Sequence, residues 1–165
     1  MSGCNLTTTM AQATREEIAK TVEQLIDEVG SWTGVTVGEH RFGGTEWRVG
    51  PREIGHVHAW GMLDIAYLRA LRDTLIEEDH TGVHHLLNES GWTTFYIEHP
   101  DDYDHARWLV RLSYLYHVSI LKKTPAGAEE YESVDVQNEL EELDISDSIT
   151  AAFERRRPGK VGSPK

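Results

Sequence analysis

A stretch of short alternating segments between two helix-forming segments most constrains how this chain can fold. Residues 33–66 are rich in glycine, β-branched residues and aromatic residues, and the pair Gly43-Gly44 is typical of a hairpin turn. We therefore expect three or four antiparallel strands here. A short strand is predicted at residues 83–87. Residues 90–99 predict another strand with a clearer pattern. It is apolar on both faces, so we expect it to be a central strand of the sheet.

Three helices are predicted around these strands. The first has a capping box, Thr14 to Glu17, and ends near Gly30. The second covers about residues 67–78, and Asp101 or Asp102 caps the third. The fold class that follows is α+β, an antiparallel sheet of about five strands covered by about three helices, with an acidic C-terminal extension.

The composition divides the chain into three parts. Residues 1–13 are expected to be a disordered leader, residues 14–123 the α+β domain, and residues 124–165 an acidic extension that ends in a basic, flexible tail. Within the extension, residues 129–148 contain nine acidic residues and no lysine or arginine. A short helix is predicted at residues 145–156.

The formal net charge of −12 argues against a phosphate-binding surface, so no nucleic-acid partner is expected. An acidic, lysine-poor surface is typical of proteins in a salt-rich cytoplasm, and we expect a halophilic, archaeal source. No apolar run approaches the roughly 20 residues that cross a bilayer, and the N-terminus lacks a signal-peptide pattern. We expect a cytoplasmic protein with no membrane partner, and we leave a homodimer open. Cys4 is expected to be an exposed bystander.

Histidines gather where strands are predicted. His56 and His58 are one residue apart on a strand, so both rings can face one site. His84 and His85 are expected to begin the next strand, and Asp64 follows the first pair. Trp92 and Tyr96 share a face of the strand predicted at residues 90–99. Such a set suits a small-molecule pocket, whereas the other five histidines are expected on the surface or in packing.

Three interpretations of this set stay open. Two imidazoles on alternate strand positions, with His84 as a third ligand, can bind a metal ion. The spacing imitates the start of a cupin motif, but the cupin glutamate is missing. The second interpretation is a metal-free site. One histidine removes a proton there, and another histidine, together with Asp64, orients or stabilises charge. In the third, the histidines are structural and the acidic segment binds a basic partner, which would make the chain a non-enzymatic interaction module.

The residues Arg52-Glu53-Ile54-Gly55-His56-Val57-His58, then His84 and the strand Gly91-Trp92-Thr93-Thr94-Phe95-Tyr96, resemble the luciferase-like domain. This family includes fungal luciferase and small prokaryotic and archaeal proteins. The similarity spans residues 34–121 and ends in a helix rich in leucine and tyrosine.

The resemblance implies an α+β domain with a pocket for a phenol- or pyrone-like substrate. It also implies an oxygenase that needs no cofactor, in which a histidine deprotonates the substrate before oxygen reacts. Carried over by position, His56, His58 and His84 are the expected catalytic residues. Asp64, His85, Trp92 and Tyr96 are the expected substrate-binding residues. Because homologous pockets often serve other chemistry, light emission is not expected.

Overall fold

The fold is taken from a computed structural model that describes residues 12–87 and 89–155. The predicted α+β class is confirmed, with six strands and six α-helices in these residues instead of about five and about three. The excess comes mainly from the extension, which contributes three short helices. The predictions for the leader up to residue 11, for Cys4 and for the tail after residue 155 lie outside the described residues.

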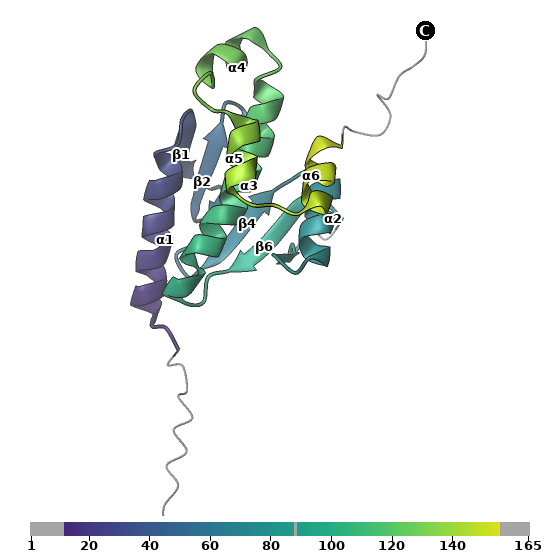
Figure 1. Ribbon diagram of the computed structural model, residues 1–165. Coiled ribbons are helices and arrows are strands. Elements are labelled where there is room, and N and C mark those ends of the chain that lie inside the picture. Colours follow the sequence, from purple (N-terminus) through teal and green to yellow (C-terminus); the bar gives the residue numbers. More distant parts are fainter. Residues whose placement is uncertain (1–11, 88, 156–165) are drawn as a thin grey trace, which may run out of the picture.

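One antiparallel sheet has the strand order β1-β2-β3-β4-β6-β5 (Figure 1). Four of its strands come from the segment at residues 33–66, as predicted. The bounds are β1 Val35–Glu39, β2 Thr45–Val49, β3 Arg52–Val57, β4 Met62–Ala66, β5 Gly82–Val83 and β6 Trp92–Tyr96. Strand β6 lies between β4 and β5, so it is an interior strand of the sheet, as predicted.

The helices begin and end close to their predicted positions. The Thr14 hydroxyl accepts a hydrogen bond from the Glu17 amide at the start of α1, as the capping box requires, and Gly30 is its last residue. Asp102 is the N-cap residue of the third helix, as predicted, but its side chain makes no capping hydrogen bond with that helix. His99 and Asp102 form a reciprocal cap on a short 3-10 turn, η1 Pro100–Asp102, and α3 continues from it. The α-helices are α1 Arg15–Gly30, α2 Arg69–Glu77, α3 Tyr103–Leu121, α4 Pro125–Glu130, α5 Val136–Glu142 and α6 Asp147–Glu154.

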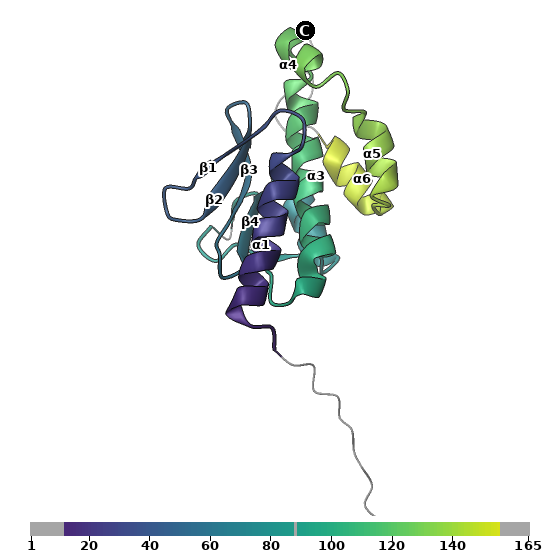
Figure 2. The ribbon, with the colours of Figure 1, turned by 90° about the vertical axis from the view of Figure 1, so that its left-hand side faces the viewer.

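Helices α1 and α3 cover the same face of the sheet (Figure 2). The core lies in this interface, where α1 and α3 bury aliphatic side chains against the apolar side of β2, β3 and β4. No helix among the described residues packs on the other face, which we call the open face. In those same residues, no helix has the length and apolar character to cross a bilayer.

A β-bulge in β3 decides which of its side chains reach the open face. Trp47 of β2 pairs with Gly55, but the next residue, Arg48, pairs with Glu53, so Ile54 is an extra residue in β3. Simple alternation predicts that Ile54 and His56 share a face. The bulge makes this prediction wrong. Ile54 is buried in the core, whereas Glu53 and His56 both lie on the open face.

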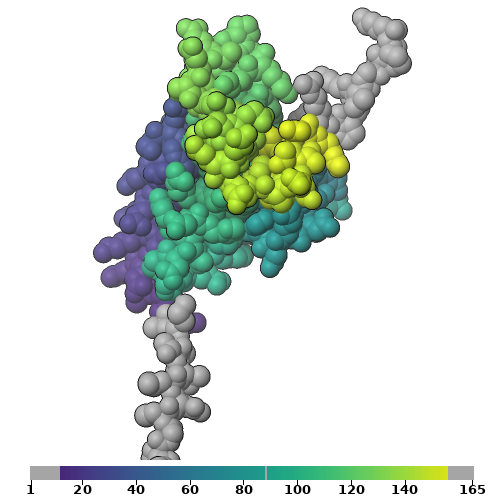
Figure 3. Space-filling model, in the orientation of Figure 1, coloured from purple at the N-terminus to yellow at the C-terminus, as the bar shows by residue number. Residues whose placement is uncertain are grey.

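The extension packs against the domain. Helix α6 contacts α2, α5 contacts α3, and the surface in Figure 3 shows residues after 135 lying against both. Tyr131, Leu140 and Ile149 are fully or nearly fully buried. The acidic side chains of this segment therefore occupy the outward side of helices whose apolar side joins the core.

Leu140 provides a test of how much this packing stabilises the fold. Leu140→Ala should lower the free energy of unfolding by about 2–3 kcal/mol, because it leaves a cavity between α5 and the core. The neighbouring, exposed Glu141→Ala is the matched control, and its effect should stay within about 0.5 kcal/mol. Urea denaturation measures both. Equal stability of the two variants would contradict the packing role.

Candidate functional site

One row of side chains crosses the open face of the sheet. The strand register aligns Glu46 of β2, His56 of β3, Asp64 of β4 and Thr94 of β6. Facing residues on neighbouring antiparallel strands lie close enough to interact directly. The Thr94 hydroxyl donates a 2.6 Å hydrogen bond to Asp64 Oδ1, and the His56 ring lies between Asp64 and Glu53. The sheet therefore places a buried charge cluster at its centre.

His56 is held by carboxylates on both ring nitrogens. Nδ1 is 2.7 Å from Glu53 Oε1, and Nε2 is 3.0 Å from Asp64 Oδ2. Both side chains of the Asp64 pair are buried, with His56 exposing 9% and Asp64 1%. Asp64 Oδ2 is paired with the His56 ring at 3.0 Å and accepts no hydrogen bond from any other described residue. It is an ion-paired but unsatisfied acceptor.

This arrangement decides which groups of the cluster are protonated. Burial lowers the pKa of His56, but the contacts with Asp64 and Glu53 outweigh it and raise that pKa to about 9. Burial raises the pKa of each carboxyl group, yet contact with His56 brings the pKa of Glu53 and of Asp64 below the usual value. At neutral pH, the cluster is an imidazolium between two carboxylates.

His58 follows β3, and its pKa is shifted downward, in the opposite direction from that of His56. Its ring meets His56 edge to face, with 5.9 Å between ring centroids. Burial lowers the pKa of His58, and the positive charge of His56 lowers it further. His58 is only partly buried. A neutral, reachable imidazole therefore lies beside a protonated one.

His84 and His85 do not begin a strand, which corrects the sequence prediction. Strand β5 ends at Val83, and both histidines lie in the connection to β6, stacked with ring centroids 4.3 Å apart. His84 Nδ1 accepts hydrogen bonds from the amides of Leu86 and Leu87, at 3.1 and 2.9 Å. Because Nδ1 accepts, the proton of the neutral ring is on Nε2, which is 3.6 Å from Asp64 Oδ2. Burial lowers the pKa of His84 and keeps it neutral.

The aromatic residues lie at two depths. Trp92 contacts the His56 ring at a centroid distance of 5.4 Å and is partly buried. Tyr96 is 45% exposed and contacts Trp60, which in turn contacts His58. The structure thus brings Trp92 into the cluster and places Tyr96 at its edge.

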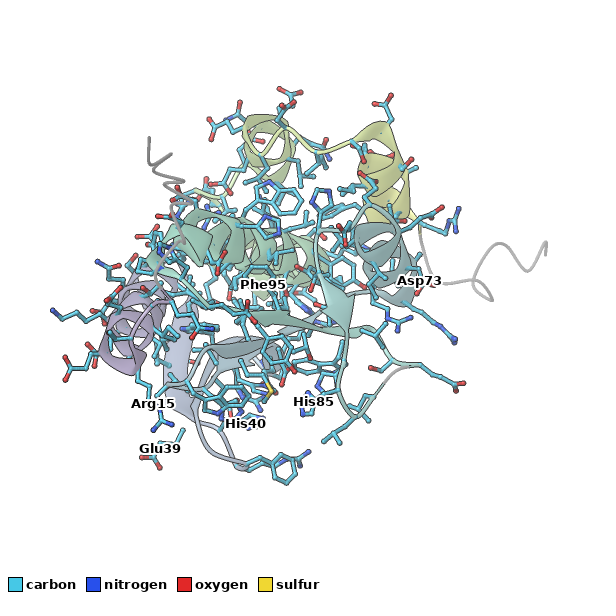
Figure 4. All side chains as sticks on the ribbon, turned by 90° about the horizontal axis from the view of Figure 1, so that it is seen from below. Arg15, Glu39, His40, Asp73, His85 and Phe95 are labelled. Carbon is cyan, nitrogen blue, oxygen red and sulfur yellow. The ribbon has the colours of Figure 1, made fainter. Side chains whose placement is uncertain are left out.

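Sequence reasoning missed several members of the cluster. His40, from the connection between β1 and β2, stacks on His56 with ring centroids 3.7 Å apart. Figure 4 shows His40 and His85 on the side of the sheet away from the helices, whereas Phe95 is on the helix side. Glu53 lies in the segment Arg52 to His58 that resembles the luciferase-like domain, but simple alternation turns it away from His56. Gly55 beside it was the available signal for a bulge.

Three overlapping sets of ligand atoms lie within 4.8 Å of one another in the described residues, and each could hold a metal ion. They are His40, Glu53 and His56; then His56, His58 and Asp64; then Asp64, His84 and His85. No set contains the three histidines expected from the sequence. The hydrogen bonds of His84 also oppose ligation through Nε2, because that nitrogen carries the proton.

The charge on His56 gives the stability of the protein a definite pH dependence. A folded pKa of about 9, against 6.5 for an ordinary histidine, contributes about 3 kcal/mol that is fully present below pH 6.5. It is lost as the pH rises from 6.5 to 9. His58 and His84 act in the opposite sense, because folding lowers their pKa values. The stability that they contribute to the protein is lost as the pH falls below 6.5.

The difference between the wild type and His56→Gln isolates this term. We expect the difference in unfolding free energy to shrink by about 3 kcal/mol between pH 6 and pH 9.5. Denaturation with urea at closely spaced pH values measures it, and His80→Gln serves as control. A difference that does not vary with pH would contradict the proposed ion pairs.

Comparison with known proteins gives one match. Residues 51–113 match the family model described as Luciferase domain. The matched segment runs from just before β3 to the middle of α3, so it includes His56, Asp64, His84 and Thr94. It covers less than half of the chain. No curated protein and no solved structure matches the chain.

Proposed function

From the luciferase-like domain at residues 51–113, we propose that the open face of the sheet binds a phenol- or pyrone-like small molecule and oxygenates it without a cofactor. One observation carries the proposal: a neutral His58 lies beside a protonated His56, and nitrogens of both rings are within 4.8 Å of a carboxylate oxygen of the buried Asp64. Neighbouring titratable groups whose surroundings drive their pKa values apart are typical of acid–base sites.

His58 is the proposed general base. His56 is unsuited to this role, because both of its nitrogens already face carboxylates and its pKa is about 9. His58 is neutral and partly exposed, so it can accept the proton of a bound hydroxyl group. Asp64 favours the protonated form of His58, but burial and the charge of His56 oppose it, so His58 can release the proton again later in the reaction.

Asp64 and His84 are the proposed positioning groups for the substrate, with His84 at its hydroxyl oxygen. Asp64 Oδ2 can accept one hydrogen bond, and His84 Nε2 can donate one, since its tautomer is fixed by Leu86 and Leu87. Trp92 supplies an aromatic wall beside His56. Trp60 and Tyr96, both exposed, supply the rim on which an aromatic ring can stack.

The proposed reaction starts when the O–H bond of the substrate breaks and its proton passes to His58. The electron pair stays on the substrate as an electron-rich enolate or phenolate. This anion gives one electron to molecular oxygen, and the resulting radical pair combines into a carbon–oxygen bond. The substrate carbon is oxidised, oxygen is reduced to a peroxide, and His58 can return its proton to the peroxide.

The test compares a hydroxypyrone with its methyl ether, which has no acidic proton. Thermal shift and oxygen uptake are measured for both ligands, then repeated with simple phenols. We expect the hydroxypyrone to raise the melting temperature and to consume oxygen, and the ether to do neither. Equal binding of both compounds, or no binding by any hydroxyl compound, would count against the proposed site. Binding without oxygen uptake would leave a ligand-binding protein and exclude the oxygenase.

A further inference from the structure

A second site lies on the helix side of the molecule, away from the histidine cluster. A cleft of about 1260 Å³ is lined by residues from β3, α3, α5 and α6, and none of the histidines of the open face contributes to it. Arg52 lines this cleft from the first position of β3. It pairs with Val49, a core residue, so its side chain lies on the opposite face from Glu53.

Arg52 differs from the other arginines that are at least partly buried. Each of those has a carboxylate partner: the pairs are Arg48–Glu46, Arg72–Asp73, Arg107–Glu28 and Arg111–Glu139. Arg52 has no carboxylate oxygen within 4.0 Å among residues 12–87 and 89–155. In a chain with 28 acidic and 16 basic residues, a half-buried arginine without a carboxylate partner is unusual.

A neutral histidine holds Arg52 in place. Arg52 Nε donates a 2.9 Å hydrogen bond to His117 Nδ1, and His117 Nε2 is 3.1 Å from the carbonyl oxygen of Ala66. Burial, together with the neighbouring Arg52, lowers the pKa of His117 to about 4. His117 therefore orients the guanidinium group without neutralising its charge, and the terminal nitrogens stay available for a ligand.

The rest of the cleft combines charge with apolar surface. Lys122 and Lys123, at the end of α3, also line it, and the Lys122 ammonium group contacts the carbonyl oxygen of Val134 instead of a carboxylate. Three exposed carboxylates, Glu132, Asp135 and Glu154, and the exposed Arg155 complete its charged lining. Apolar walls come from Leu68, Tyr116, Ile120, Val136 and Phe153.

We propose that this cleft binds a small organic carboxylate, with Arg52 paired to the carboxylate group and the aromatic or aliphatic body packed on the apolar wall. A planar guanidinium group binds a carboxylate through two parallel hydrogen bonds. The lining has four cations against three carboxylates, so a single negative charge balances it better than the double charge of a phosphate. The site is independent of the histidine cluster.

The test uses the full chain and three probes: naphthoate, its uncharged amide, and naphthyl phosphate. Isothermal titration calorimetry should show that naphthoate binds more tightly than either of the other two. Arg52→Gln should weaken naphthoate binding by a factor of about ten or more, as expected for a lost charge-assisted pair. Arg69→Gln, which removes an exposed arginine outside the cleft, should change the dissociation constant by less than a factor of about two.

A second variant protects the test against misfolding of Arg52→Gln. Lys123 is exposed, so Lys123→Gln should keep the fold and weaken naphthoate binding by a factor of about two to five. Ring resonances of Tyr116 and Phe153 should shift when naphthoate binds. Equal affinity for naphthoate and its amide, tighter binding of the phosphate, or no effect of either variant would overturn the proposal.

Discussion

His58→Gln should lower kcat/KM for oxygenation of a hydroxypyrone by a factor of about 10² to 10⁴, because the glutamine amide cannot accept the substrate proton. Glutamine keeps a polar side chain of comparable size, and His58 is partly exposed, so the fold should not change. Loss of turnover with little change in KM would assign His58 to proton transfer.

The control for this experiment is His80→Gln. His80 packs against Trp108 and His105 on the helix side and contacts no residue of the cluster. Its replacement should leave kcat/KM within a factor of about two. A His58→Gln protein with the turnover of the wild type would remove His58 from the mechanism and leave the binding site without an identified base.

Asp64→Asn should lower the free energy of unfolding by about 3–5 kcal/mol, the usual cost of removing one partner from a buried ion pair. Asparagine can still accept the Thr94 hydrogen bond, but it leaves the buried imidazolium of His56 with Glu53 as its remaining carboxylate. The pKa of His56 should then fall from about 9 toward its ordinary value.

Two measurements follow both effects. Urea denaturation reports the loss of stability, and NMR titration of the His56 ring reports its pKa. Glu39→Gln, an exposed carboxylate of β1, is the matched control and should change stability by less than about 0.5 kcal/mol. A loss below about 1 kcal/mol for Asp64→Asn, with the His56 pKa unchanged, would contradict the role of Asp64 in the cluster.

Local patterns predicted most of the scaffold. The capping box at Thr14, the end of α1 at Gly30 and the four strands of residues 33–66 depend on interactions between near neighbours in the chain, so the sequence reports them directly. The alternation within β6 likewise placed Trp92 and Thr94 on the same face, where they contact His56 and Asp64.

Features that depend on distant partners were not predicted. The stacking of His40 on His56 needs the hairpin between β1 and β2 to fold over β3. The burial of Leu140 and Ile149 needs α2 and α3 as partners, which a run of acidic residues conceals. The pairing of Arg52 with His117 joins residues 65 positions apart. The expected salt-adapted surface, cytoplasmic location and homodimer stay predictions.

The bulge in β3 also determines how related sites can be recognised in other chains. Glu53 and His56 meet across three positions because Ile54 is an extra residue, whereas a regular strand brings a glutamate two positions before the histidine to the same place. Deleting one residue at Ile54 or Gly55 therefore changes the spacing without changing the ion pair. A search pattern with fixed spacing would pass over such chains, and one that allows two or three positions would find both forms.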